Sequence, residues 1–259
     1  YHNYHDRAHG YKNILSWIYL ILLNVICFFT IGHYPKQVNA SNSGKHKKLP
    51  LTESESMVRF RQGKSVDDVV SELMKYDIVS FDIFDTLIMR KIFSPEDVFR
   101  LLGEKVRTEL KLDCEIAGIR AQAAAQCGSN ATINEIYKQI RKSTNLTDDD
   151  IVGIMQLEKD IDIDLCIARR DIADLYEYCL ACGKEVYFIS DMYYTLQDIK
   201  CILDKCGVTI PDDEHIWISC EKKSDKVSGS IWKEYSELVG KDIKCLHIGD
   251  NKTGDVENP

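Results

Sequence analysis

The chain has 259 residues, of which 44% are hydrophobic and 29% are charged, so it can fold as one large domain or as a domain with appendages. Its formal net charge of −8 argues against general nucleic-acid binding, which needs a basic face. The ten cysteines are scattered. The single CxxC spacing, Cys179 with Cys182, has no second pair, so we expect core cysteines rather than a zinc or redox site.

The first landmark is an uncharged apolar run from Ile14 to Gly32. As a helix it would span about 28 Å, close to the hydrocarbon core of a bilayer. We therefore expect a transmembrane helix within a membrane-anchor segment, residues 1–36. A signal peptide is the rival interpretation, although the run is longer than a usual signal sequence. Most flanking lysines follow the run, so the positive-inside rule places the bulk of the chain, everything after the run, in the cytoplasm.

Residues 37–64 are rich in Ser, Asn and Lys and are predicted to form a flexible linker. The folded part is expected to begin at Ser65, which together with Asp68 resembles a capping box in front of an apolar helical stripe. Because the sequence opens on Tyr1 rather than Met, we expect the chain to be part of a longer protein.

The run Ile78-Val79-Ser80-Phe81 has the composition of a buried strand, and Asp82, Asp85 and Thr86 follow it. A carboxylate at the carboxyl end of such a strand lies where open α/β sheets bind their ligands. Asp82 is therefore a candidate nucleophile or metal ligand. The alternative is a strand-end Asp that only caps a turn.

Helical signals fill residues 94–168. Thr132 with Glu135, and Thr147 with Asp150, match capping boxes in front of apolar patterns of helical period. A further helix is expected shortly after the start of this stretch. Few strand signals fall within it, so we expect an all-helical insertion between two strands of a sheet.

Strands and helices alternate again after the insertion. Apolar strand-like runs occur at residues 186–190, 216–219 and 245–248, with helical patterns between them. Alternation of this kind predicts a parallel, doubly wound α/β sheet, assembled from residues 65–93 and 169–259. The strands of such a sheet deliver the polar residues that follow them to the same carboxyl edge.

Carboxylates, hydroxyls and a lysine collect at this predicted edge. Several carboxylates in one place repel each other and call for a cation, and oxygen ligands suit Mg²⁺. A lysine and a hydroxyl nearby complement an anionic group, and an aspartate can attack it to form an aspartyl-phosphate. The pattern therefore indicates phosphoryl transfer. The residues expected at this edge are Asp82, Asp85, Thr86, Ser190, Asp191, Asp250 and Asp255, with Lys222, Lys223 and Lys226 as the candidate lysines.

Four stretches resemble, in order, the motifs of the haloacid dehalogenase (HAD) superfamily: FDIFDTL, FISDMY, SDKVSG and HIGDNKTGD. The resemblance implies a HAD-like Rossmannoid core in which Asp82 is the nucleophile, Ser190 contacts the phosphoryl group and Lys226 is the lysine of the third motif. Asp250 and Asp255, in the GDxxxxD spacing of the fourth motif, are then ligands of Mg²⁺. The helical insertion stands where many members carry a substrate-selecting cap domain.

The chain departs from the phosphatases of this superfamily at one position. Their second Asp, the general acid and base, is here Phe84, and Asp85 stands where the family usually has Gly. Mg²⁺ binding is not put in doubt, because the family uses the backbone carbonyl at the Phe84 position. Proton delivery to the leaving group is put in doubt, and a missing acid typically costs about 10²–10⁴ in rate.

The resemblance thus implies a Mg²⁺-dependent hydrolase, specifically a phosphatase of a small phosphorylated, sugar-related substrate. Two alternatives account for the missing acid: Asp85 serves as a substitute, or the substrate has a good leaving group. Mg²⁺ would be held by Asp82, the Phe84 carbonyl and the GDxxxxD pair. Thr86, Ser190, Asp191 and Lys226 would contact the substrate, although Asp191 has the alternative of only orienting its neighbour or capping the next helix. His247 is expected to be a satisfied core residue.

Two alternatives to a phosphatase stay open. An aromatic residue at position 84 also occurs in the metal-independent dehalogenases of the superfamily, which attack carbon. The second alternative is a catalytically weak regulatory or scaffold domain. It follows from the phrases SFDIFDTLI, FISDMY and HIGDN, which are similar to a bacterial subgroup associated with surface-polysaccharide glycosyltransferases. That similarity implies a glycosyltransferase as a partner or a fused domain.

Overall fold

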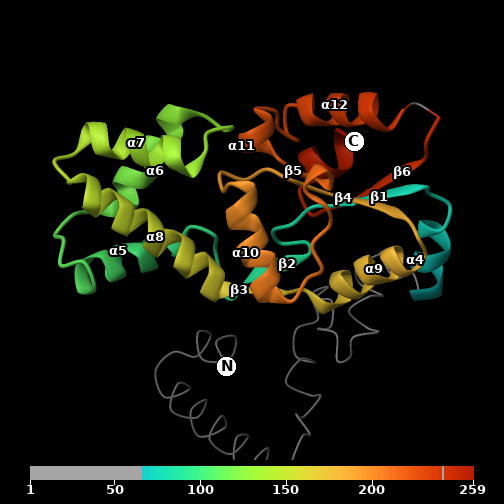
Figure 1. Cartoon of the computed structure of the whole chain (residues 1–259), viewed down its shortest axis with the longest axis horizontal. Helices are drawn as coiled ribbons and strands as arrows, with labels where there is room; N and C mark the ends of the chain where they lie inside the picture. The colour runs from blue at the N-terminus through green and yellow to red at the C-terminus, as the bar shows by residue number, and fades with distance from the viewer. Residues whose placement is uncertain (1–65, 241) are drawn as a thin grey trace, which may run out of the picture. The chain divides into compact units, whose positions relative to one another are not determined.

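The computed structural model describes residues 66–240 and 242–259 (Figure 1). The predicted membrane-anchor segment with its transmembrane helix, the linker and the capping residue Ser65 lie outside these residues. Among the helices that are described, none is both long enough and apolar enough to cross a membrane.

The centre of the fold is a parallel sheet with strand order β5-β4-β1-β6. Its strands are β1 (Ile78–Phe81), β4 (Glu185–Ser190), β5 (Ile216–Ile218) and β6 (Cys245–Ile248). The chain moves outward from β1 through β4 to β5 and then returns to the other side of β1, so the direction of winding reverses between β1 and β6. Open α/β sheets bind ligands at such a reversal, beyond the carboxyl ends of the strands.

Helices cover both faces of this sheet, which confirms the predicted doubly wound arrangement (Figure 1). One face carries α4 (Val66–Leu73), α9 (Arg170–Ala181) and α10 (Leu196–Cys206), and the other carries α12 (Ser230–Val239). Consecutive residues of β4 point to opposite faces. The ring centroid of Phe188 lies 5.0 Å from that of Tyr176 in α9, and the ring centroid of Tyr187 lies 5.3 Å from that of Tyr235 in α12.

The insertion is a group of helices that pack on one another beside the sheet domain (Figure 1). These helices are α5 (Asp97–Thr108), α6 (Ile116–Cys127), α7 (Ile133–Ser143) and α8 (Asp148–Leu165). Both predicted capping boxes are present: Thr132 with Glu135 begins α7, and Thr147 with Asp150 begins α8.

Two features of the insertion differ from the all-helical, three-helix prediction. The insertion begins and ends on a two-stranded antiparallel ribbon made by β2 (Ile88–Arg90) and β3 (Cys166–Ala168), and these strands are too short to show a period in the sequence. α6 was not predicted, because its sequence IAGIRAQAAAQC is rich in Ala and shows no apolar stripe of helical period.

The remaining elements are short and lie close to the carboxyl edge of the sheet or before β5. They are the 3₁₀ turn η2 (Asp213–His215), the helix α11 (Ser219–Lys222) and the π-helical turn η3 (Lys252–Glu257). Ser219, predicted as the last residue of a strand, instead begins α11. The loop that follows α11 carries Lys226, and η3 carries Asp255, so both reach the edge where β1 and β6 end.

Candidate active site

Three carboxylates meet beyond the carboxyl ends of β1 and β6. Asp82 follows β1, Asp250 follows β6, and Asp255 is carried by η3; one oxygen of each lies within 4.8 Å of the others. The backbone N–H of Asp82 donates to the carbonyl of Ile248 at 2.9 Å, which extends the β1–β6 pairing up to the site. The structure therefore brings together the carboxylates that the sequence placed at this edge.

Lys226 bridges two of these carboxylates. Its Nζ lies 2.7 Å from Oδ1 of Asp82 and 2.6 Å from Oδ1 of Asp255, and its side chain is 4% exposed. Burial lowers the pKa of Lys226, but the two carboxylates outweigh it and raise this pKa above its ordinary value. The lysine is therefore charged, yet one positive charge faces the three carboxylates of Asp82, Asp250 and Asp255.

The charge imbalance shows in the pKa of Asp82. Burial raises this pKa to about 7, and repulsion from Asp255 and Asp250 adds to the rise, while Lys226 opposes it. A carboxylate must be ionised to act as a nucleophile. Additional positive charge at the site would lower the pKa of Asp82, and a cluster of carboxylate oxygens is the kind of donor set that Mg²⁺ takes. The residues present therefore fit a hard divalent cation.

Asp255 is held from several sides. Its Oδ2 accepts the backbone N–H of Asn251 at 2.9 Å, and its Oδ1 receives Lys226 together with His247 Nε2, at 3.1 Å. Burial opposes ionisation of Asp255, but these partners outweigh it and lower its pKa to about 2. The backbone of Gly249 lies against this carboxylate: a Cβ added at Gly249 would lie 2.3 Å from Cγ of Asp255. The glycine in the HIGD stretch therefore makes room for this carboxylate.

His247 and Ser80 form a buried support behind Asp255. They face each other in the β1–β6 pairing, and Nδ1 of His247 lies 2.8 Å from Oγ of Ser80. The ionised Asp255 can only accept hydrogen bonds, so Nε2 of His247 carries the proton and Nδ1 accepts from the Ser80 hydroxyl. Trp232 packs edge-on against the imidazole at 4.6 Å between ring centroids. His247 is a satisfied core residue, as predicted, and it also contacts the site.

The contact of His247 with Asp255 was missed, although the sequence contains a signal for it. Ser80 and His247 are polar residues in the middle of two strands that are otherwise apolar. Such residues need hydrogen-bond partners when buried. Only the pairing of β1 with β6 shows that the two residues face each other.

Asp191 contacts the loop that carries Lys226, whereas Ser190 and Thr86 are buried at the ends of β4 and β1. Both carboxylate oxygens of Asp191 accept the backbone N–H of Lys226, at 2.9 and 3.1 Å, so Asp191 supports the lysine loop. It does not cap α10, which begins instead on a capping box at Thr195. Ser190 and Thr86 are 1% and 2% exposed. Oγ1 of Thr86 has no hydrogen-bond partner among the described residues.

Asp85 and Phe84 differ sharply in their surroundings. Asp85 is exposed and has a φ of 57°, in the left-handed region that favours glycine. Its carbonyl accepts a hydrogen bond from Arg169 Nη1 at 2.6 Å. The Phe84 side chain is buried in the main core, beneath the guanidinium of Arg90, which lies 4.5 Å from the ring centroid. Partial burial raises the pKa of Asp250, and repulsion from Asp85 and Asp255 adds to the rise.

No protein-family model matches the chain, and no curated protein matches it. Solved structures are similar in the arrangement of their elements. The magnesium-bound HAD-hydrolase YfnB of Bacillus subtilis has 13% identity and a TM-score of 0.46, with 71% of this chain and 83% of that chain covered. A 2-haloacid dehalogenase of Pseudomonas syringae has 11% identity and a TM-score of 0.48, with 71% and 81% covered.

A HAD family enzyme of Bacteroides thetaiotaomicron is similar to a comparable extent. Its identity is 17% and its TM-score is 0.45, with 69% of this chain and 86% of that chain covered. Identity at this level does not carry the role of a residue from one chain to another. The chemistry of the site is therefore argued from its own residues.

Proposed function

We propose that the chain is a hydrolase of the HAD type, a metal-dependent phosphatase that uses Asp82 as its nucleophile. The observation that carries the proposal is the Asp82–Lys226–Asp255 arrangement. The buried carboxylate of Asp82 lies 2.7 Å from Nζ of Lys226, and the same Nζ lies 2.6 Å from Asp255. This arrangement lies at the reversal of the sheet, next to Asp250. The resemblance of the four sequence motifs to the HAD superfamily supports the same assignment.

In the proposed reaction a carboxylate oxygen of Asp82 attacks phosphorus, and the bond from phosphorus to the leaving-group oxygen breaks. The products of this step are an aspartyl-phosphate and, after the leaving oxygen has taken up a proton, an alcohol. Lys226 and the hydroxyls of Ser190 and Thr86 hold the phosphoryl oxygens. Water then adds to phosphorus, the Asp82 carboxylate leaves, and inorganic phosphate is released.

The metal site of the proposal consists of Asp82, Asp250 and Asp255, together with the backbone carbonyl of Phe84 that the resemblance implies. A bound Mg²⁺ supplies positive charge that screens the nucleophile and the phosphoryl oxygens from each other. Asp255 is held by His247 and by the backbone N–H of Asn251, and it pairs with Lys226. It therefore also helps to fix the position of the lysine.

Asp85 is our candidate for the proton donor to the leaving group. The Phe84 side chain is buried in the core and has no proton to give. Asp85 is exposed in the loop that follows Asp82, and it keeps a backbone conformation that a non-glycine residue adopts only at a cost. A strained residue at a reactive site is a reason to infer that its side chain is used.

The principal experiment measures hydrolysis of p-nitrophenyl phosphate and acetyl phosphate with Mg²⁺ and then with EDTA. Both substrates have good leaving groups, so they report on the nucleophile and the metal. We expect Mg²⁺-dependent turnover that Asp82→Asn abolishes while the circular dichroism spectrum is unchanged. Turnover that is insensitive to EDTA would favour the dehalogenase-like alternative. A folded protein without turnover would favour the regulatory alternative.

The role of Asp85 is tested by its replacement with glycine, which adopts the left-handed conformation without strain. For Asp85→Gly we expect turnover of acetyl phosphate to be retained and turnover of an alkyl phosphate to fall by about 10²–10⁴. The alkyl alcohol is a poor leaving group and depends on the acid. An equal fall for both substrates would show that Asp85 is not the proton donor.

Other parts of the proposal rest on the sequence. They are the anchoring of a cytoplasmic hydrolase domain by residues 14–32, the use of residues 94–168 as a substrate-selecting cap, and the association with a glycosyltransferase. The cap interpretation is supported by contacts between the insertion and the loop that carries Lys226, among them Asn130 with Asp225 and Lys223 with Glu135.

A further inference from the structure

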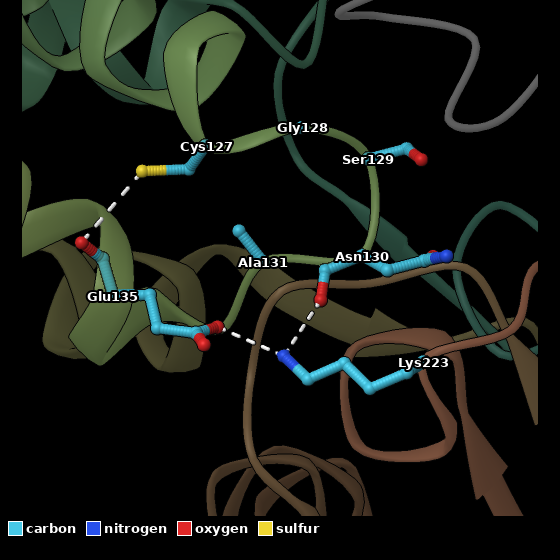
Figure 2. Close-up of a pocket in the computed structure, with 7 residues that line it drawn as sticks. All are labelled: Cys127, Gly128, Ser129, Asn130, Ala131, Glu135 and Lys223. Atoms are coloured by element: carbon cyan, nitrogen blue, oxygen red, sulfur yellow. Dashed lines mark hydrogen bonds and ion pairs between the residues drawn. The ribbon is translucent and has the colours of Figure 1, made fainter.

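The loop that carries Lys226 is bound, ahead of the lysine, by residues of the insertion. Nζ of Lys223 donates to Oε2 of Glu135 at 2.9 Å and to the carbonyl of Asn130 at 3.0 Å. Figure 2 shows this nitrogen between the Glu135 carboxylate and the Asn130 carbonyl. Nδ2 of Asn130 in turn donates to Oδ2 of Asp225 at 3.2 Å. The path of the chain up to Lys226 is therefore set by contacts on its amino-terminal side.

Asn258 holds the same loop at the lysine itself and at the residue after it. Its Nδ2 donates to the carbonyl of Lys226 at 2.9 Å and to the carbonyl of Val227 at 2.7 Å. Backbone carbonyls only accept hydrogen bonds, so the amide nitrogen of Asn258, and not its amide oxygen, must face the loop. Each of the two N–H groups on this nitrogen is used for one carbonyl.

Asn258 directly follows η3, the element that carries Asp255. Its own backbone N–H donates to the carbonyl of Thr253 at 3.2 Å, so its position is fixed to that turn. Other residues of the turn contact the lysine side chain: Asp255 lies 2.6 Å from Nζ, and a Cβ added at Gly254 would lie 3.2 Å from Cβ of Lys226. This segment therefore reaches the lysine at its ammonium, its Cβ and its carbonyl.

The hold on the backbone matters because the ammonium of a lysine stands at the end of a flexible four-carbon stem. Its position depends on the placement of the Cα as well as on its ionic partners. Asp191 accepts the backbone N–H of Lys226 at 2.9 and 3.1 Å, and Asn258 binds the carbonyl. Both peptide groups that flank the Cα are thus fixed. A positive charge that is already in place needs no reorganisation when a phosphoryl group develops negative charge.

We propose that Asn258 is a positioning residue, which binds the carbonyls of Lys226 and Val227 and so places the Lys226 ammonium to contact Asp82 and a phosphoryl oxygen. The contact with the phosphoryl oxygen rests on the proposed function. The hold of Asn258 on the lysine loop does not depend on any reaction, so the two can be tested separately.

The first measurement is the reactivity of the lysines of the whole chain with acetic anhydride, followed by peptide mass spectrometry. The Lys226 side chain is 4% exposed, and acylation needs an accessible amine, so we expect Lys226 to be protected in the wild type. Asn258→Leu keeps the approximate size of the side chain, removes the donor and should increase acetylation of Lys226. Lys184, whose Nζ donates to the carbonyl of Tyr76, is the internal reference.

The second measurement separates the positioning of the lysine from general support of η3. Binding of inorganic phosphate in the presence of Mg²⁺ is followed by calorimetry, and binding of Mn²⁺ by electron paramagnetic resonance. For Asn258→Leu we expect weaker phosphate binding and a fall in p-nitrophenyl phosphate turnover of up to about 10²-fold, with no loss of Mn²⁺ affinity. Asn258→Gln retains an amide donor and should recover part of the phosphate affinity.

The matched control is Val256→Ala, which changes a 68% exposed side chain in the same turn. We expect this variant to keep the protection of Lys226, the phosphate affinity and the turnover of the wild type. If Asn258→Leu does not fold, Asn258→Asp takes its place. It has the same size, and its carboxylate turns an acceptor towards the two carbonyls, so the same measurements apply.

The outcomes separate the inference from the proposed function. Equal protection of Lys226 in the wild type and in Asn258→Leu overturns the inference and leaves a hydrolase in place. A parallel loss of Mn²⁺ and phosphate affinity also overturns it, because Asn258 then supports η3 as a whole. Increased acetylation of Lys226 in Asn258→Leu, while the wild type neither binds phosphate nor turns over acetyl phosphate, supports the hold on the lysine and overturns the phosphatase function.

Discussion

Asp255 is the residue whose position depends most on its neighbours. Its carboxylate meets Lys226, His247 and the backbone of Asn251 within 3.1 Å, and it lies against a glycine that leaves no space for a side chain. Lys226 comes from the loop after α11, whereas His247, Gly249 and Asn251 lie within five residues of each other at the end of β6. A small displacement of any of them moves the lysine that contacts the nucleophile.

Gly249→Ala should therefore disable the site. The added Cβ would lie 2.3 Å from Cγ of Asp255, so the carboxylate or the backbone has to move. A displacement of about 1 Å at a catalytic group can cost about 10²-fold in rate, and we expect a loss of at least this size in p-nitrophenyl phosphate turnover. Gly103→Ala is the control, since its Cβ would lie 3.9 Å from Ile116. Wild-type turnover in Gly249→Ala would contradict the described position of Asp255.

His247 is expected to act on the metal site through Asp255. His247→Phe removes the donor to Asp255 and the acceptor for Ser80, and the loss of such a supporting group typically weakens metal affinity by about 10–100-fold. His247→Gln retains an amide that can donate to Asp255 and should recover part of the affinity. Titration with Mn²⁺, followed by electron paramagnetic resonance, measures both variants without any assay of turnover. Equal affinity in wild type and His247→Phe would limit His247 to a packing role.

At the scale of the element, the helices α6, α7 and α8 of the insertion each begin with a side chain that accepts a backbone N–H of the first turn. The hydroxyl oxygen of Thr132 accepts the backbone N–H of Glu135, and the Glu135 carboxylate accepts the backbone N–H of Thr132. Two N–H groups at the start of α7 are therefore satisfied. The same carboxylate pairs with Lys223. The first turn of α7 is therefore tied both to its own cap and to the loop of Lys226.

This arrangement predicts how the stability of the protein changes in acid. The backbone bond to Thr132, followed by Lys223, lowers the pKa of Glu135 to about 2, whereas an unfolded Glu titrates near about 4.3. A carboxylate with a lowered pKa stabilises the fold above the unfolded pKa, and this contribution is lost as the pH falls towards 2. Wild type should therefore be more stable than Glu135→Gln at pH 6, with the difference shrinking between about pH 4.3 and 2. Urea unfolding at several pH values measures it, and a difference that does not vary with pH would contradict it.

At the scale of the whole described domain, buried polar contacts of Asp162 join the insertion to its ribbon and to the segment after β4. Asp162 of α8 accepts from Arg90 of β2 at 2.5 and 3.1 Å and from the hydroxyl of Tyr194, after β4, at 2.7 Å. A second pair, Arg120 with Glu158, lies within the insertion with both side chains at most 2% exposed. Removing one member of a buried pair leaves the other charge without compensation.

Asp162→Asn should accordingly be strongly destabilising. The Arg90 guanidinium would remain at 10% exposure without its counter-charge, and such changes typically cost about 3–5 kcal/mol. Asp213→Asn is the control, because Asp213 pairs with Lys200 at the surface and exposed pairs contribute about 1 kcal/mol or less. The free energy of unfolding in urea compares the two variants. A loss for Asp162→Asn no larger than for Asp213→Asn would show that Arg90 finds other compensation.

Several elements could be predicted from local sequence patterns. Strands of the sheet, the capping boxes of α7 and α8, and the polar residues after β1, β4 and β6 can all be read within a few residues, because period, capping and turn signals act over short distances. Because these signals are local, elements without a local signal were not predicted. β2, β3 and α6 have little pattern of their own and are stabilised by contacts with other elements.

Which of these residues contact one another depends on the packing of the whole fold. Lys226 contacts Asp82 across 144 residues, and Ser80 contacts His247 across 167, because the pairing of β1 with β6 and the path of the loop after α11 bring them together. Asn130 meets Asp225 across 95 residues for a similar reason: the packing of the insertion sets the position of its loop. Strand order and helix packing are properties of the whole chain, since they depend on burying apolar surface that no single segment can cover alone.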